Sequence, residues 1–128
     1  MLSPHPKVGR HSQWQNVGWV KSNDQLFRDD YRTMYINPVD AAARGLKDRD
    51  LVKVHNDRGS MVCSTVITER VMPAILYVWE GGWYQPQEPG NQNSIDLGGN
   101  PNVVIAPRQG ELTHGMVANT LVQVEKWK

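Results

Sequence analysis

The chain has 128 residues, 39% hydrophobic and 21% charged, and 14 lysines and arginines against 13 aspartates and glutamates leave a net charge of +1. The apolar fraction is too high and the net charge too small for a disordered chain. The near-equal numbers of basic and acidic residues provide no basic excess with which to bind nucleic acid. The length fits one domain over residues 1–128. Without a run of about 18 apolar residues or a signal peptide, we predict neither membrane insertion nor a targeting segment, and both a cytoplasmic and a periplasmic location stay open.

The first 35 residues show no clean periodicity and form a lead-in segment, in which a short helix or loop is expected over 24–32. The next segment predicts a two-turn helix. Asn37 is a favourable N-cap, and Pro38 suits the first helical position because its missing N–H is not needed there. Gly45 can adopt the left-handed conformation that ends a helix.

A β-hairpin is predicted directly after this helix. Residues 51–55 alternate between apolar and polar side chains, which is typical of a half-buried strand. The turn 56–59 reads Asn-Asp-Arg-Gly, and residues 60–68 are rich in β-branched side chains and form the return strand.

Three further strands are expected in the second half of the chain, over residues 74–79, 103–105 and 121–125. The first is almost wholly apolar, which predicts burial on both faces. The connection 80–102 is long for a compact domain, and such connections are usually functional or disordered. The sum is a mainly β domain, best described as a small β-barrel with one or two short helices.

Several motifs, in order along the chain, resemble the C-terminal cofactor-binding domain of the dimethyl sulfoxide reductase family of molybdopterin oxidoreductases. Each is weak alone, but together they cover almost the whole sequence. They are the opening His11-Ser12-Gln13, Asn37-Pro38-x-Asp40-Ala41-x-x-Arg44-Gly45, Asp50-x-Val52-x-Val54-x-Asn56-Asp57-Arg58-Gly59, Val66-x-Thr68-Glu69-Arg70-x-x-Pro73, Glu80-Gly81-Gly82-Trp83-Tyr84, Asn102-Val103 and Asn119-Thr120-Leu121-Val122-Gln123-Val124-Glu125-Lys126.

The resemblance implies a double-psi β-barrel similar to that of aspartate decarboxylase, with residues 1–35 as lead-in and 36–128 as barrel. It also implies a cofactor, a molybdenum or tungsten centre held by two pterin guanine dinucleotides (bis-MGD). The domain would cap this cofactor as part, or as small subunit, of an anaerobic oxidoreductase, either a reductase or a transhydroxylase-like enzyme. Its partner would be the remaining domains or a large subunit, and it would not be catalytic alone.

A pterin is a flat heterocycle with many donors and acceptors at its edge, and its phosphates suit backbone N–H groups of glycine-rich turns. The resemblance implies no catalytic residue and no metal ligand in this chain. The cofactor contacts that it implies are His11, Ser12, Gln13, Gly81, Gly82, Trp83, Asn102, Gly115, Asn119 and Thr120.

Other interpretations of these residues stay open. Gly81 and Gly82 suit a bulge at a strand end, with Trp83 covering the core. The barrel could also serve as a protein-interaction or assembly module without a cofactor, because fold does not determine function. The two functions differ in one respect. Convergence of His11, Gln13, Asn102 and Asn119 on one concave face would favour cofactor binding, whereas scattered positions would favour an interaction module.

Metal chemistry has little support in the sequence. Cys63 is the only cysteine, which excludes cysteine-based zinc patterns and an internal disulfide. His5, His11, His55 and His114 are scattered and show no H-x-x-x-H spacing, so we predict no dedicated zinc site.

The chain departs from the family pattern at two turns. Arg49 and Ala74 stand where the family usually has glycine, after an aspartate and after a proline respectively. We interpret both positions as structural. The stretch 87–99 looks closer to transhydroxylase-type members than to simple oxide reductases.

Overall fold

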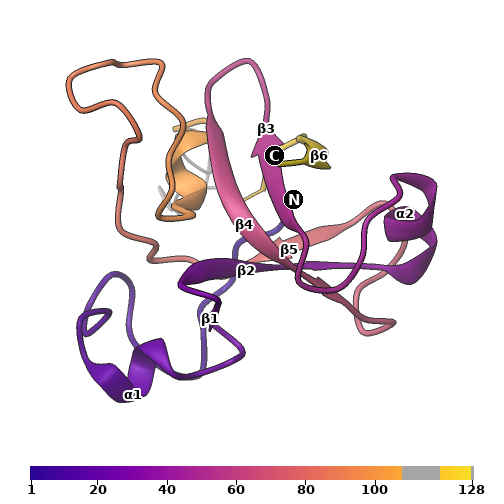
Figure 1. Ribbon diagram of the computed structural model, residues 1–128, viewed down its shortest axis with the longest axis horizontal. Coiled ribbons are helices and arrows are strands. Elements are labelled where there is room, and N and C mark those ends of the chain that lie inside the picture. Colours follow the sequence, from indigo (N-terminus) through magenta and orange to yellow (C-terminus); the bar gives the residue numbers. More distant parts are fainter. Residues whose placement is uncertain (108–118, 128) are drawn as a thin grey trace, which may run out of the picture.

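The computed structural model describes residues 1–107 and 119–127, and the fold is mainly β with a few short helices. Figure 1 shows the strands gathered at the centre, with α1 and the connection 80–102 on one side and α2 on the other. The elements are α1 (Gly18–Lys21), β1 (Phe27–Arg28), β2 (Tyr31–Ile36), α2 (Pro38–Ala43), β3 (Leu51–His55), β4 (Ser60–Ile67), β5 (Leu76–Val78), the 3-10 helix η1 (Pro101–Val103) and β6 (Gln123–Lys126).

The strands form one sheet in the order β1-β2-β4-β3-β6, and β5 also pairs with β2. The pair β2–β4 is parallel, and the other pairs are antiparallel. These pairings confirm a mainly β domain. Among the described residues they form an open path from β1 to β6 and not a closed ring.

The β3–β4 hairpin confirms its prediction, with His55 opposite Ser60 across the turn. β4 lies between β2 and β3 in the sheet, and its residues are buried from Met61 to Val66, which includes side chains on both faces. The side-chain amide of Asn56 donates to the carbonyl oxygens of Val104 (2.8 Å) and Leu121 (3.1 Å). The hairpin tip is therefore tied to two later segments of the chain.

Helix α2 is also confirmed, with Asn37 at its N-cap. The Asn37 side-chain oxygen accepts the N–H of Val39 at 3.0 Å, and its amide nitrogen donates to the Val71 carbonyl at 2.7 Å. Gly45 follows the helix with a φ of 63°. The helix directs the chain from β2 towards β3.

Other expected elements differ from the structure. The short helix near the start is α1, which lies before the expected range 24–32. In that range β1 and the start of β2 form an antiparallel β-hairpin instead. The prediction of a strand over 103–105 is wrong. The 3-10 helix η1 begins at Pro101, which cannot donate to a β-ladder, and the Asn100 side chain caps this helix. β5 is shorter than 74–79, and Ala74 before it has a positive φ of 64°. β6 begins two residues later than predicted.

The N-terminal residues lie beside β5 and the last described segment. The Leu2 N–H donates to the Leu76 carbonyl at 2.8 Å, and the terminal amine of Met1 donates to the Thr120 carbonyl at 2.6 Å. In the part of the chain that the structure describes, no helix is long and apolar enough to cross a membrane.

Candidate functional site

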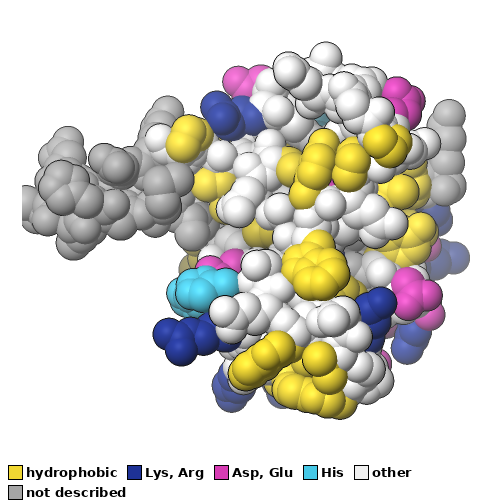
Figure 2. Space-filling model, turned by 90° about the vertical axis from the view of Figure 1, so that its left-hand side faces the viewer, with side chains coloured by type: hydrophobic (Ala, Val, Ile, Leu, Met, Phe, Trp, Pro, Cys, Tyr) yellow, Lys and Arg dark blue, Asp and Glu magenta, His cyan; other side chains and the backbone are white. Residues whose placement is uncertain are grey.

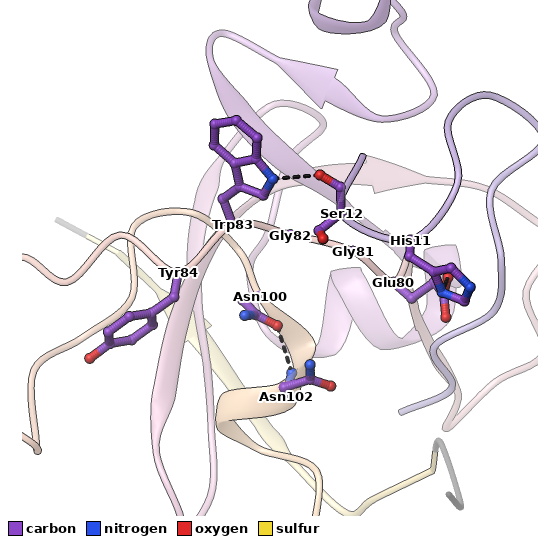
Figure 3. Close-up of a pocket in the computed structure, with 9 residues that line it drawn as sticks. All are labelled: His11, Ser12, Glu80, Gly81, Gly82, Trp83, Tyr84, Asn100 and Asn102. Atoms are coloured by element: carbon purple, nitrogen blue, oxygen red, sulfur yellow. Dashed lines mark hydrogen bonds and ion pairs between the residues drawn. The ribbon is translucent and has the colours of Figure 1, made fainter. Parts of the chain in front are cut away.

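Three segments far apart in the sequence meet around one cavity of about 550 Å³. They are the lead-in at 11–12, the segment after β5 at 80–84, and the start of η1 at 100–102. Figure 3 shows them side by side, with Asn100 and Asn102 across from Ser12 and Trp83. The lining residues are His11, Ser12, Glu80, Gly81, Gly82, Trp83, Tyr84, Asn100 and Asn102.

Glycine is required where the lead-in crosses the segment after β5. Gly81 has a φ of 85°, and a Cβ built there would overlap the His11 carbonyl. A Cβ on Gly82 would lie 2.6 Å from the Gly99 carbonyl oxygen. Both glycines are thus explained by chain packing, and their backbone groups still form one wall of the cavity.

The lead-in is held on this wall through Trp83. Its indole N–H donates to the Ser12 carbonyl at 2.5 Å, and its backbone N–H donates to the side-chain oxygen of Gln15 at 3.3 Å. His11 has a positive φ of 51°. Such backbone conformations are uncommon outside glycine and cluster at functional sites.

The long connection before η1 is ordered by one buried carboxylate. Asp96 is fully buried, and its side chain accepts the N–H groups of Gln85 (2.7 Å), Gly98 (3.0 Å) and Asn100 (2.6 Å). Its backbone also pairs with β4, since the Val62 N–H donates to the Asp96 carbonyl at 2.8 Å. Asp96 therefore positions the segment in which Asn100 lines the cavity.

Arg32 lies beneath the same wall. It is 1% exposed and donates to the Glu80 carbonyl, while Gly99 packs against its side chain. Burial lowers the pKa of Arg32 to about 10, and the nearby Cys63 and Glu80 oppose this shift. The guanidinium is thus still charged at neutral pH, and it holds the Glu80 carbonyl directly before Gly81.

The polar side chains on the opposite side are amides. The Asn100 oxygen accepts the Asn102 N–H at 3.0 Å, which leaves the Asn100 NH₂ group to donate, and the Asn102 side chain is exposed. Trp83 and Tyr84 are about half exposed. Amides, an imidazole and a hydroxyl beside aromatic rings can hydrogen-bond the edge of a flat heterocycle, so the donor set fits a pterin.

The structure brings together six of the ten residues predicted from the resemblance: His11, Ser12, Gly81, Gly82, Trp83 and Asn102. Gln13 is exposed and does not line the cavity. Asn119 and Thr120 line a different cavity, beside Met1 and Asn56. Gly115 lies outside the described residues. Of the four side chains chosen to test for one concave face, His11 and Asn102 share the cavity, whereas Gln13 and Asn119 do not.

Sequence reasoning did not assign Glu80, Tyr84 and Asn100 to the site, although all three line the cavity. Glu80 and Tyr84 flank the Gly-Gly-Trp motif, and Asn100 stands two residues before Asn102. Adjacency to these motifs was the available signal. It could not show that the Asn100 side chain both caps η1 and faces the cavity.

Comparison with known proteins identifies the family. Residues 1–122 match the family model described as "Molydopterin dinucleotide binding domain". The chain is 34% identical over 129 residues to the dimethyl sulfoxide/trimethylamine N-oxide reductase of Cereibacter sphaeroides, covering 99% of this chain and 15% of that protein. It is 37% identical over 123 residues to dimethyl sulfoxide reductase DmsA of Escherichia coli, covering 95% and 14%.

Two other relatives extend the comparison beyond the oxide reductases. The large subunit of pyrogallol hydroxytransferase from Pelobacter acidigallici is 34% identical over 136 residues, covering 99% of this chain and 15% of that protein. The solved structure of acetylene hydratase from Pelobacter acetylenicus has a similar fold, with a TM-score of 0.72 and 13% identity over 98% of this chain and 18% of that chain.

These matches define both the family and the share of each relative that this chain represents. The chain spans about 15% of the length of the curated relatives it matches. Its identity to the reductase of Cereibacter sphaeroides equals that to the hydroxytransferase, so whole-chain identity does not separate the two subgroups. The chain belongs to the molybdopterin dinucleotide-binding domains of the dimethyl sulfoxide reductase family.

Proposed function

We propose that the cavity between the lead-in, the segment after β5 and η1 holds a pterin of the bis-MGD form of the cofactor, carrying molybdenum or tungsten. The observation that carries this proposal is the polar set converging there from three segments, with His11 and Ser12 on one side and Asn100 and Asn102 on the other. The family assignment supports a molybdopterin-type cofactor.

Each residue has a definite part in this arrangement. The side chains of His11, Ser12 and Asn102 hydrogen-bond the heterocycle edge, and Gly81, Gly82 and Trp83 form the close wall beside it. A cavity of about 550 Å³ suits the pterin and not a whole dinucleotide. Gln13, Asn119 and Thr120 then contact the rest of the cofactor outside this cavity, and Gly115 remains a proposed cofactor contact without a described position. When bound, the metal supplies oxidation–reduction chemistry, which this chain's own side chains lack.

We also propose that residues 1–128 form a single domain with double-psi β-barrel topology, within a larger oxidoreductase. The similarity to acetylene hydratase and the parallel β2–β4 pair support this topology. The domain caps the cofactor, and the remaining domains or a large subunit complete the site. Figure 2 shows hydrophobic patches on the face that carries α1 and the connection 80–102. Exposed apolar patches suit contacts with another part of a protein.

The test is the composition of the protein purified from its own host in its native assembly. We expect molybdenum or tungsten, with two equivalents of guanosine monophosphate released by acid per metal ion. Asn102→Ala is expected to lower both contents several-fold because it removes one edge contact. Gln92→Ala replaces an exposed amide outside this cavity and is expected to leave them unchanged.

Two results would contradict the proposal. One is an assembly with neither metal nor guanosine monophosphate, which would favour an interaction module. The other is an Asn102→Ala protein with the same metal and nucleotide content as the Gln92→Ala control.

A further inference from the structure

Two of the four histidines meet a carboxylate at one end of the cavity. Nδ1 of His5 lies 2.7 Å, and Nδ1 of His11 2.9 Å, from the same oxygen of Glu80. One ligand atom from each of the three residues lies within 4.8 Å of the others. Figure 3 shows His11 and Glu80 against one another, at the opposite end of the cavity from Tyr84. The sequence hides this cluster, because Glu80 lies far along the chain from the two histidines.

The shared Glu80 oxygen lies at ion-pair distance from both imidazoles, but neither contact has hydrogen-bond geometry. It is buried and accepts no hydrogen bond from any residue that the structure describes, although two ring nitrogens are close to it. The two imidazole rings stand edge to face, with centroids 5.0 Å apart. The three groups therefore converge on one point.

Backbone contacts hold together the two segments that carry the three residues. The Glu80 N–H donates to the Pro4 carbonyl at 3.1 Å, directly before His5, and Arg32 donates to the Glu80 carbonyl. Gly81 packs against the His11 backbone. Each of the three residues is thus at, or next to, a backbone contact between the lead-in and the segment after β5. These contacts bring the three residues together before any ion binds.

We propose that His5, His11 and Glu80 bind a divalent transition-metal ion of the zinc type at the rim of the cavity. Imidazole nitrogen and carboxylate oxygen are zinc ligands, whereas Mg²⁺ and Ca²⁺ prefer oxygen ligands alone. Ligand atoms in a tetrahedral zinc site lie about 3.3 Å apart, so small side-chain rotations open the observed spacings to that value. Three protein ligands leave one position for water or for an anionic oxygen of a ligand in the cavity.

This site shares only His11 with the proposed pterin contacts, so the two proposals can be tested separately. His5 does not line the cavity, and coordination through Nδ1 leaves Nε2 of His11 available to the pterin. A failure of metal binding therefore leaves the cofactor proposal standing, and the reverse also holds.

The test compares zinc binding by matched variants of the protein in its native assembly. Each protein is treated with a chelator, dialysed against ZnCl₂ over a range of concentrations and assayed for zinc per chain. We expect the wild type to bind one more Zn²⁺ than His5→Ala at low concentration, with the affinity of this site weakened at least about tenfold by the substitution. Glu80→Gln, which keeps the side-chain volume, is expected to weaken it similarly.

His55→Ala is the matched control. His55 also lies near a carboxylate, 3.6 Å from Glu125, but there Lys53 occupies the same oxygen at 2.9 Å. Its substitution is expected to change zinc binding less than twofold. Equal zinc content in wild type and His5→Ala at every concentration would overturn the proposal, as would an equal loss in His55→Ala. Thermal unfolding checks that His5→Ala, which alters a largely exposed side chain, keeps the fold.

Discussion

Among the six described non-glycine residues with a positive φ, Arg49 and Ala74 differ from the family pattern. Arg49 has a φ of 68° and Ala74 a φ of 64°, and both stand where the family resemblance predicts glycine. A side chain in the left-handed region is strained because its Cβ crowds the backbone. The sequence identified these two positions as structural departures, and the structure supplies the reason.

Ala74→Gly is therefore expected to stabilise the protein. Replacing alanine removes the left-handed strain, and the Ala74 N–H can still donate to the Asp40 carboxylate at 2.6 Å. We expect the free energy of unfolding to rise by about 1 kcal/mol, measured by urea denaturation. The control Ala42→Gly changes an exposed residue inside α2, where glycine costs about 1 kcal/mol. A loss of stability in both variants would contradict the interpretation of Ala74.

Cys63 is a buried thiol in β4, fully shielded from solvent. Burial raises its pKa to about 12, and the charge of Asp96 acts in the same direction, against the opposing effect of Arg32. Because the thiolate is the reactive form, we expect Cys63 to resist a disulfide reagent at pH 8 in the folded protein and to react in urea. Modification of the folded protein at the rate of an exposed thiol would contradict this expectation.

At the scale of elements, the connection 80–102 shows how one buried side chain can organise a long segment. The length of the connection predicted a functional or a disordered loop. The structure shows an ordered one, since three N–H groups converge on the Asp96 carboxylate. Few regular elements form there, so no periodic pattern in the sequence could indicate this order.

Asp96→Ala is expected to lower the free energy of unfolding by about 3 kcal/mol or more, because it leaves buried N–H groups without an acceptor. The loop should also become sensitive to limited proteolysis. Glu88→Ala removes an exposed carboxylate from the same connection, where its only described partner is Asn91, and should change stability by less than about 0.5 kcal/mol. Equal effects of the two substitutions would exclude a special role for Asp96.

For the molecule as a whole, ion pairs connect the last strand to the sheet. Lys126 lies 3.1 Å from Asp50, and Lys53 lies 2.9 Å from Glu125 on the pair β3–β6. The pKa of Asp50 is lowered first by the N–H of Lys47 and then by Lys126, and the pKa of Glu125 is lowered by its hydrogen bond from Lys53. β6 is thus held in place partly by charges that acid removes.

This arrangement predicts lower stability in acid. Both folded-state pKa values lie below those of the unfolded chain, so the unfolded state binds more protons as the pH falls past about 4. The stabilisation is present above that pH and is lost as the pH falls through the folded-state values. We expect the urea midpoint to fall between pH 5 and pH 3, and to fall less steeply in Asp50→Asn. An unchanged slope in that variant would show that Asp50 does not contribute.

The candidate site could be predicted in part because some of its residues are required by local chemistry. The Gly-Gly-Trp motif after a buried strand and the Asn-Pro-Asn capping sequence are visible without a structure. The contributions of Glu80 and Asn100, and the separate position of Asn119, depend on how distant segments cross.

The sequence by itself determined α2, the β3–β4 hairpin and the family, because caps, turns and alternating side chains act over a few residues and the motifs keep their order. Only the tertiary structure decided which loops share a cavity, that Asp96 orders the long connection, and that His5, His11 and Glu80 meet. The physical reason is that these contacts join residues far apart along the chain. Their geometry is set by the crossing of backbones at Gly81 and Gly82, which no local pattern encodes.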